Sequence, residues 1–266
     1  MKTNFNQLNS VKKFLSFCFT VLVFQAYSQQ LYYSQYQLTP MLNNPSLIAL
    51  SEEIKIDAGY RNQFGGKGGN YSTPLFAGYM PIYKESVQNQ FTKLGAGGIQ
   101  LFTDRTGYGG MLATTGFSIT YAHLVQLSAK DKLSFGLTPG FFQRRVDFSG
   151  LKSGSQWDSF YGEYKEQLPL NEEIAQTERR TFLTINSGLT YLRERSNGDQ
   201  FFTFSVAANN LTRPNISLNS KSFSNPVGWN IQSSIVAFED DQFIVKPTFR
   251  HIQVRNLSQT NIGSYF

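Results

Sequence analysis

Two histidines, His123 and His251, are the side chains of this 266-residue chain best suited to general base catalysis near neutral pH. A lipid hydrolase would pair such a base with a serine and a third, orienting group. Both histidines fall on predicted strands far apart in sequence, and a strand-end histidine is the simpler interpretation of His251, with a catalytic base as the alternative. Residues 65–69 are glycine-rich, but no helical pattern follows them as in a phosphate loop, and no metal-ligand spacing occurs. We therefore expect neither an enzyme nor a bound cofactor or metal.

A long segment, residues 146–178, carries side chains suited to binding. It interleaves carboxylates with aromatic rings, a combination that can hold a protein ligand or a cation. The alternative is a solvated surface loop, although loops of this length are more often functional or disordered. The candidate contact residues are Trp157, Tyr161, Glu163 and Tyr164.

A second candidate segment lies near the N-terminus and is rich in amides and prolines. Prolines fix the course of the backbone, and amide side chains can satisfy polar groups around them. The segment either plugs or lines the inside of a barrel, which is the commoner need, or it touches a periplasmic partner. Its candidate residues are Ser34, Gln35, Tyr36, Pro40, Asn43, Asn44 and Pro45.

Long strands must position these side chains. Over residues 113–127 the chain alternates, with Phe117 and Ile119 on one face and Ser118 and Thr120 on the other. Similar segments of about 10 to 15 residues recur, a length typical of tilted membrane strands. We expect strands over residues 53–64, 71–83, 94–103, 111–127, 132–145, 179–193, 200–211, 227–238, 242–252 and 259–266.

The connections between these strands alternate between long and short. An outer-membrane barrel places long loops outside the cell and short turns in the periplasm. Residues 146–178 and 212–226 fit the first class, and residues 128–131 and 196–199 fit the second. A soluble β-sandwich, the alternative, has no reason to sort its loops in this way. The predicted fold class is all-β, a transmembrane antiparallel β-barrel of about ten strands.

Residues 1–28 have the features of a cleaved secretory signal peptide, with a basic start, an apolar stretch and small residues at the cleavage site. The apolar stretch, about 13 residues, is shorter than the roughly 20 that a spanning helix needs. A lipoprotein signal using Cys18 is the alternative, but Phe17 is bulky where a small residue is expected. The predicted organisation is a signal peptide over residues 1–28, a lumen or periplasmic segment over 29–52 and the barrel over 53–266.

Cleavage would remove the only cysteine of the chain, so no intramolecular disulfide could form. It would also lower the formal charge from +6 to +3, because the removed segment holds three lysines and no acidic residue. The high positive charge of the full chain is therefore not evidence for nucleic-acid binding.

The mature N-terminal sequence, residues 30–45, resembles the opening signature of the PorP/SprF family of type IX secretion system membrane proteins. Further similar stretches extend almost to the end of the chain: residues 60–64, 95–107, 121–123, 133–137, 209–217 and Pro247. Family members usually continue through several more strands, so we expect residues 261–266 to begin a strand whose partners are missing. In the alternative, Phe266 is the insertion signal of a ten-strand barrel, an allowed even number.

The resemblance implies an outer-membrane component of type IX secretion and gliding motility. Such a protein would bind or anchor a secreted surface adhesin or another secretion component, with membrane lipid around it and no nucleic acid. The alternative function is an outer-membrane pore or a transporter of hydrophobic solutes. Small, uncharged residues on the inward face argue mildly against an open channel.

Overall fold

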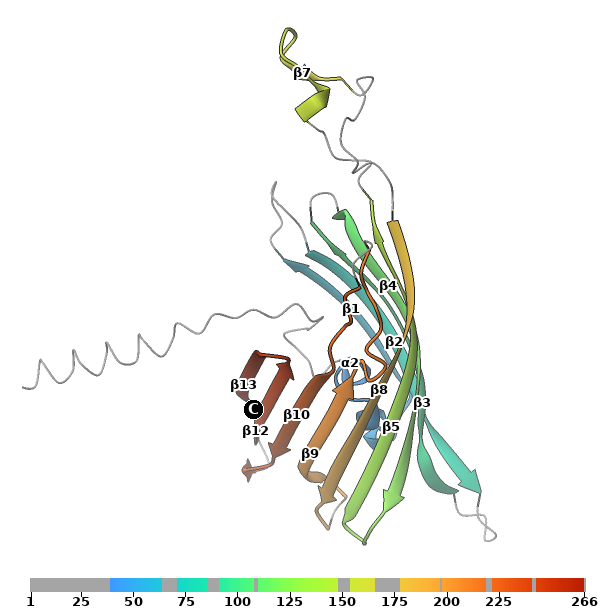
Figure 1. Cartoon of the computed structure of the whole chain (residues 1–266). Coiled ribbons are helices and arrows are strands. Elements are labelled where there is room, and N and C mark those ends of the chain that lie inside the picture. Colours follow the sequence, from blue (N-terminus) through green and yellow to red (C-terminus); the bar gives the residue numbers. More distant parts are fainter. Residues whose placement is uncertain are drawn as a thin grey trace, which may run out of the picture.

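Ten long strands form one antiparallel sheet in the computed structural model (Figure 1). The described residues are 39–63, 71–85, 91–107, 110–147, 154–165, 178–196, 198–218, 222–240 and 243–265. The long strands are β1 (Lys55–Gln63), β2 (Tyr71–Glu85), β3 (Phe91–Thr106), β4 (Leu112–Gln126), β5 (Asp131–Val146), β8 (Glu178–Glu194), β9 (Gln200–Asn209), β10 (Gly228–Ile235), β12 (Ile244–Val254) and β13 (Leu257–Tyr265). Each overlaps one of the ten predicted segments, so the predicted all-β antiparallel architecture is confirmed.

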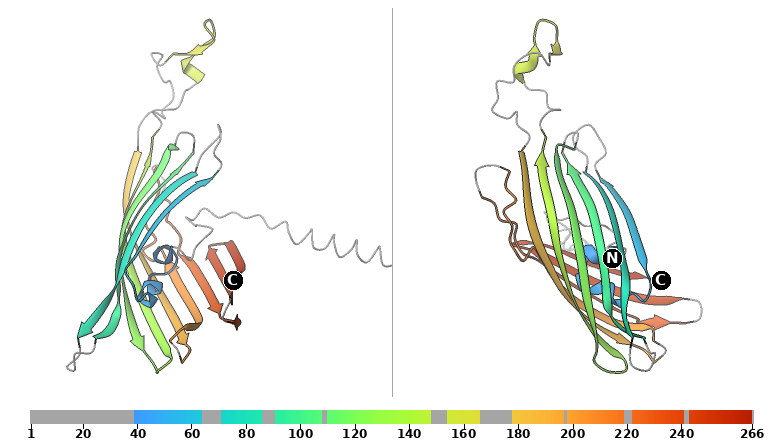
Figure 2. Two further views of the ribbon diagram at one scale, coloured as in Figure 1. Left: turned by 180° about the vertical axis from the view of Figure 1, so that it is seen from behind. Right: turned by 90° about the vertical axis from the view of Figure 1, so that its right-hand side faces the viewer.

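The sheet curves like the wall of a barrel and stays open (Figure 2). Each long strand pairs with its neighbours in sequence, and among the described strands β1 and β13 form the two free edges. The short strand β11 (Phe238–Glu239) pairs with β12 and does not extend the curved wall. Closure into a complete barrel is therefore not seen.

The two faces of the sheet differ as the alternation predicts. On the convex face large apolar side chains are exposed, including Phe117, Ile119 and Phe141. On the concave face the alternating partners are small or polar and buried, including Ser118 and Thr120. Because side chains of successive strand residues point to opposite faces, this pattern gives an apolar outer surface and a polar inner one.

The two ends of the sheet differ in their connections. At one end, which we call the turn end, short turns join β4 to β5 and β8 to β9 (Figure 1). The first of these turns is held by Ser128, whose hydroxyl accepts from the Asp131 N–H at 3.1 Å and donates to the Asp131 carboxylate at 2.7 Å. The opposite end, which we call the loop end, carries the long connection between β5 and β8.

Two short helices lie against the concave face, α2 (Pro40–Asn43) and η2 (Pro45–Leu50) (Figure 2). Each begins with a proline. Proline suits the first helical position because an N–H there would have no partner within the helix. Helix η2 packs against β3, β4, β5 and β8. Among the described residues, no helix combines the length and apolar character needed to cross a membrane.

Several predicted features lie outside the described residues. They are the signal peptide over residues 1–28, the candidates Ser34, Gln35 and Tyr36, the glycine-rich residues 65–69 and the terminal Phe266.

Candidate functional site

Residues 39–51, which we call the inner segment, run along the concave face about midway between the ends of the sheet (Figure 2). The predicted site residues Asn43, Asn44 and Pro45 are buried there, and Pro40 is half-buried. Its apolar side chains, Met41, Ile48 and Ala49, pack against the strands. The segment is thus fixed both by apolar burial and by the polar contacts described next.

The polar side chains of the inner segment bond to the sheet. The hydroxyl oxygens of Ser46 and Thr190 are 2.6 Å apart, and Ser134 Oγ donates to the Ser46 carbonyl at 2.8 Å. Asn44 Nδ2 donates to the Val206 carbonyl at 3.3 Å, while its Oδ1 accepts from the Ser46 N–H at 3.0 Å. Buried polar groups are costly unless they are paired, so these contacts fix one position of the segment.

Arg250 and Asn230 hold the segment from the other side. Arg250, only 1% exposed, donates through Nη2 to Asn43 Oδ1. Asn230 Nδ2 donates to the Asn43 carbonyl at 3.0 Å. Hydrogen bonds from a charged donor are about twice as strong as neutral ones. Asn43 is therefore held through both its side-chain oxygen and its backbone carbonyl.

A row of small residues makes room for the inner segment. Successive strands place Ala or Gly side by side in register: Ala96, Ala122, Gly136, Gly188 and Ala207. A Cβ atom on Gly136 would lie 2.3 Å from the Ser46 nitrogen, and one on Gly188 would lie 1.8 Å from Asn44 Oδ1. The backbone of the segment thus approaches the sheet more closely than any larger side chain would allow.

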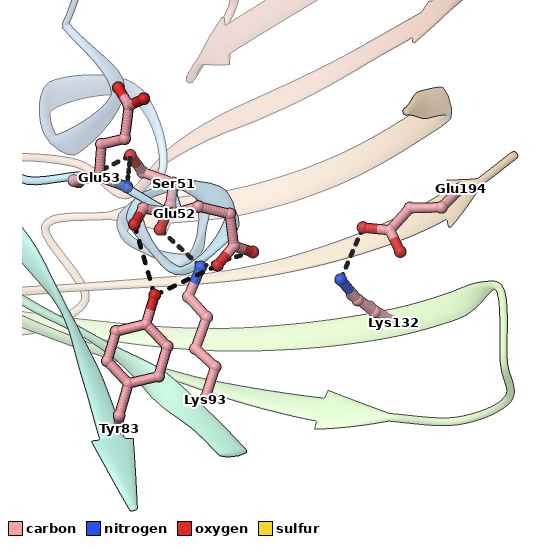
Figure 3. A network of polar contacts seen from close by, with 7 residues as sticks. All are labelled: Ser51, Glu52, Glu53, Tyr83, Lys93, Lys132 and Glu194. Atoms are coloured by element: carbon pink, nitrogen blue, oxygen red, sulfur yellow. Dashed lines mark hydrogen bonds and ion pairs between the residues drawn. The ribbon is translucent and has the colours of Figure 1, made fainter. Parts of the chain in front are cut away.

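A network of polar contacts fixes the end of the inner segment at the turn end of the sheet (Figure 3). Lys93 Nζ donates to the Ser51 carbonyl and lies 3.1 Å from the Glu52 carboxylate. Tyr83 donates its hydroxyl to Glu52 at 3.4 Å. The ion pair between Lys132 and Glu194, 2.6 Å, joins β5 to β8, with β4 between them and the strand of Lys93. Sequence reasoning missed this network, because it depends on which strands are neighbours.

The candidate residues Trp157, Tyr161, Glu163 and Tyr164 lie on a small hairpin, residues 154–165, beyond the loop end of the sheet (Figure 1). Short strands β6 (Trp157–Asp158) and β7 (Glu163–Tyr164) pair there, preceded by the single turn η4 (Gly154–Gln156). The rings of Trp157 and Tyr164 meet edge to face with centroids 4.9 Å apart. The structure thus brings all four predicted residues together on one element that was expected to be a loop.

Asp158 organises this hairpin. Its carboxylate lies 2.7 Å from Lys165 Nζ and accepts the backbone N–H groups of Phe160 and Tyr161. The Lys165 contact, together with those two N–H groups, holds the pKa of the Asp158 carboxyl below its usual value. Lys165 also lies 3.7 Å from the centre of the Tyr161 ring. The exposed aromatic rings are therefore presented on an ordered support.

The two histidines lie apart. His123 is on β4 beside Tyr121, and His251 is on β12 beside Thr260, with four strands of the sheet between β4 and β12. Within the described part of the chain, no group of three or more His, Cys, Asp and Glu side chains is placed to hold a metal ion.

Residues 25–266 match the family described as type IX secretion system membrane protein PorP/SprF. The chain belongs to the PorP/SprF family. The match to the PorP/SprF family covers the inner segment, the ten strands and the hairpin. A comparison with curated proteins gave no match. As a PorP/SprF protein, the chain is a membrane component of type IX secretion.

Proposed function

We propose that this PorP/SprF protein resides in the outer membrane and binds or anchors a secreted surface adhesin or another secretion component. The observation that carries the proposal is the hairpin of residues 154–165. It lies within the long connection between β5 and β8, the kind of connection that outer-membrane barrels place outside the cell.

The chemistry of the hairpin suits protein recognition. Phe160 and Tyr161 are 87% and 65% exposed, and Trp157 and Tyr164 are also exposed. Tryptophan and tyrosine dominate protein interfaces because they bury large areas at low conformational cost. The Asp158 and Lys165 contacts reduce that cost further, since the support of the rings is already ordered in the free protein.

The buried inner segment supports binding over conduction. It occupies the concave face, most of its residues are buried, and we propose that it acts as a plug. The alternative function, a pore or a transporter of hydrophobic solutes, needs a continuous path along that face.

The test uses tagged full-length protein extracted from secreting cells in mild detergent. We expect an exported surface protein or another type IX component to co-purify, and the variant W157A/Y161A to reduce its recovery about tenfold or more, because hot-spot aromatics each contribute about 2 kcal/mol or more. The matched control is F223A, another exposed ring in a connection between strands, which should retain the partner. Recovery that is equal in W157A/Y161A and F223A would contradict the proposal.

Current recordings in planar bilayers test the alternative function, a pore or a transporter of hydrophobic solutes. Planar bilayers containing the well-inserted protein should show no solute-selective current. Selective currents that persist in W157A/Y161A would favour the pore instead.

A further inference from the structure

Three arginines form one row across the convex face near the loop end of the sheet. The register aligns Arg105 on β3 with Ala113 on β4, Ala113 with Arg145 on β5, and Arg145 with Arg179 on β8. Residues aligned in this way across an antiparallel sheet share a face. We call Arg105, Arg145 and Arg179 the arginine row.

The arginine row lies directly beyond the apolar surface. On β5 and β8, the pair Phe141 and Leu183 is 52% and 64% exposed on the same face. One polar pair, Gln143 and Thr181, separates it from Arg145 and Arg179. At about 3.4 Å per residue and a strand tilt of about 45°, the arginine Cα atoms lie about 10 Å above the last apolar pair.

With the last apolar pair at the edge of the hydrocarbon core, that height places the arginine Cα atoms about 3 to 5 Å beyond the headgroup layer of a bilayer. The layer adds roughly 5 to 7 Å on each side of the hydrocarbon core. Long cationic side chains extend along the surface, so a guanidinium can reach several ångströms from its Cα atom. Arg145 and Arg179 can therefore place their charges among lipid headgroups.

Within the described part of the chain, the arginine row has no adjacent counter-charge on its own face of the sheet. Among the described residues, Arg105, Arg145 and Arg179 have no side-chain hydrogen bond or ion pair. The carboxylates nearest in register, Asp104 and Glu178, are aligned with Thr114 and Val146 and so lie on the concave face. The row is thus a set of cations that faces outward.

Arg145 and Arg179 lie directly opposite each other on β5 and β8. Like charges directly opposite each other on neighbouring strands destabilise a sheet. An anion that bridges the two guanidinium groups removes that repulsion, and phosphate fits because arginine binds it through two parallel N–H donors.

We infer that the arginine row binds the phosphate groups of a phosphorylated membrane lipid in the leaflet at the loop end of the sheet. The inference rests on the membrane placement in the proposed function but not on partner binding by the hairpin. It gives the protein a lipid site that would fix its height and orientation in the bilayer.

The test measures lipid retention by the full chain purified in a neutral detergent. The probes are a diphosphorylated lipid A and the same lipid without phosphates, each counted on the protein by native mass spectrometry. We expect the wild type to retain the phosphorylated lipid preferentially. The variant R145Q/R179Q should weaken that retention about tenfold or more, the loss expected for one charge-assisted hydrogen-bonded contact.

The control R213Q/R255Q removes the same charge from connections between the strands, and it should bind lipid as the wild type does. If R145Q/R179Q lacks the β-sheet circular dichroism of the wild type, lipid retention is measured on R179Q alone. Equal retention of both lipids by the wild type would overturn the inference, as would full displacement of the lipid by an equal concentration of inorganic phosphate. Partner recovery with W157A/Y161A is a separate readout, so failure of this inference is distinguishable from failure of the proposed function.

Discussion

Gly136 faces the inner segment, and adding one methyl group there should displace that segment. A Cβ atom would lie 2.3 Å from the Ser46 nitrogen and 2.4 Å from the Pro45 carbonyl carbon. Both are backbone atoms, so no side-chain rotation relieves the clash. Overpacking of this kind costs typically about 1 to 3 kcal/mol.

The clash exists only while the segment is attached, whereas the contacts of Ser46 with Ser134 and Thr190 are lost on detachment in the wild type and the variant alike. We therefore expect Gly136→Ala to shift the equilibrium toward a detached inner segment by about 1 to 3 kcal/mol. At 1.4 kcal/mol for each factor of ten, the detached population rises about 5-fold to 140-fold.

Chymotrypsin digestion of the folded protein reports this population. The segment contains Leu42, Leu47 and Leu50, and cleavage there follows the detached fraction when reattachment is fast. Gly263→Ala is the matched control, because its Cβ atom would meet only Thr248 Oγ1 at an ordinary 3.5 Å. Equal cleavage rates for Gly136→Ala and Gly263→Ala would show that Gly136 does not make room for the inner segment.

Further substitutions test other contacts of the inner segment and of the hairpin. Arg250→Met keeps the buried stem but removes the guanidinium that binds the inner segment, and should increase chymotrypsin cleavage by about tenfold or more; unchanged cleavage would contradict this. Lys93→Met should free only the end of the segment, with a smaller increase of about fivefold, measured as cleavage after Leu50 against Leu42. The pKa of the Asp158 carboxyl is lowered in the folded hairpin. Ionised Asp158 therefore stabilises the hairpin fully above pH 3.8, the usual pKa, and this stabilisation is lost as the pH falls through the lower, folded-state pKa. In a W229F background the fluorescence of Trp157 should stay constant from pH 7 to about pH 4 and change at lower pH, whereas adding D158N should abolish that acid transition.

Strand positions could be predicted because the alternation of apolar and polar residues is a local pattern that indicates each strand without knowledge of its neighbours. The bounds differ where polar residues extend a strand beyond its apolar part. For residues 94–103 the observed strand is Phe91–Thr106, since backbone pairing continues past the apolar surface. For residues 200–211 the strand ends at Asn209, because Asn210 adopts a positive φ of 59°. The two-residue strands of the hairpin are too short to show alternation.

The surroundings of the inner segment could be predicted only in part. Asn43, Asn44 and Pro45 stand out as amides and a proline before the first strand. Their contacts with Gly136 and Arg250 depend on the register of strands far apart in sequence. Register is set by turns and by irregularities such as the bulge between Ile82 and Tyr83, and a single sequence does not specify the alignment across several strands.

We propose that the hairpin of residues 154–165 contacts a type IX secretion partner at the cell surface. The most direct measurement places a photo-crosslinking amino acid at Tyr161 in secreting cells and compares it with the same group at Phe223. We predict that the group at Tyr161 forms an adduct with an exported surface protein or another type IX component, and that the group at Phe223 does not. Surface-exposed, correctly inserted protein that gives no adduct at Tyr161, or the same adducts at both positions, would contradict the claim.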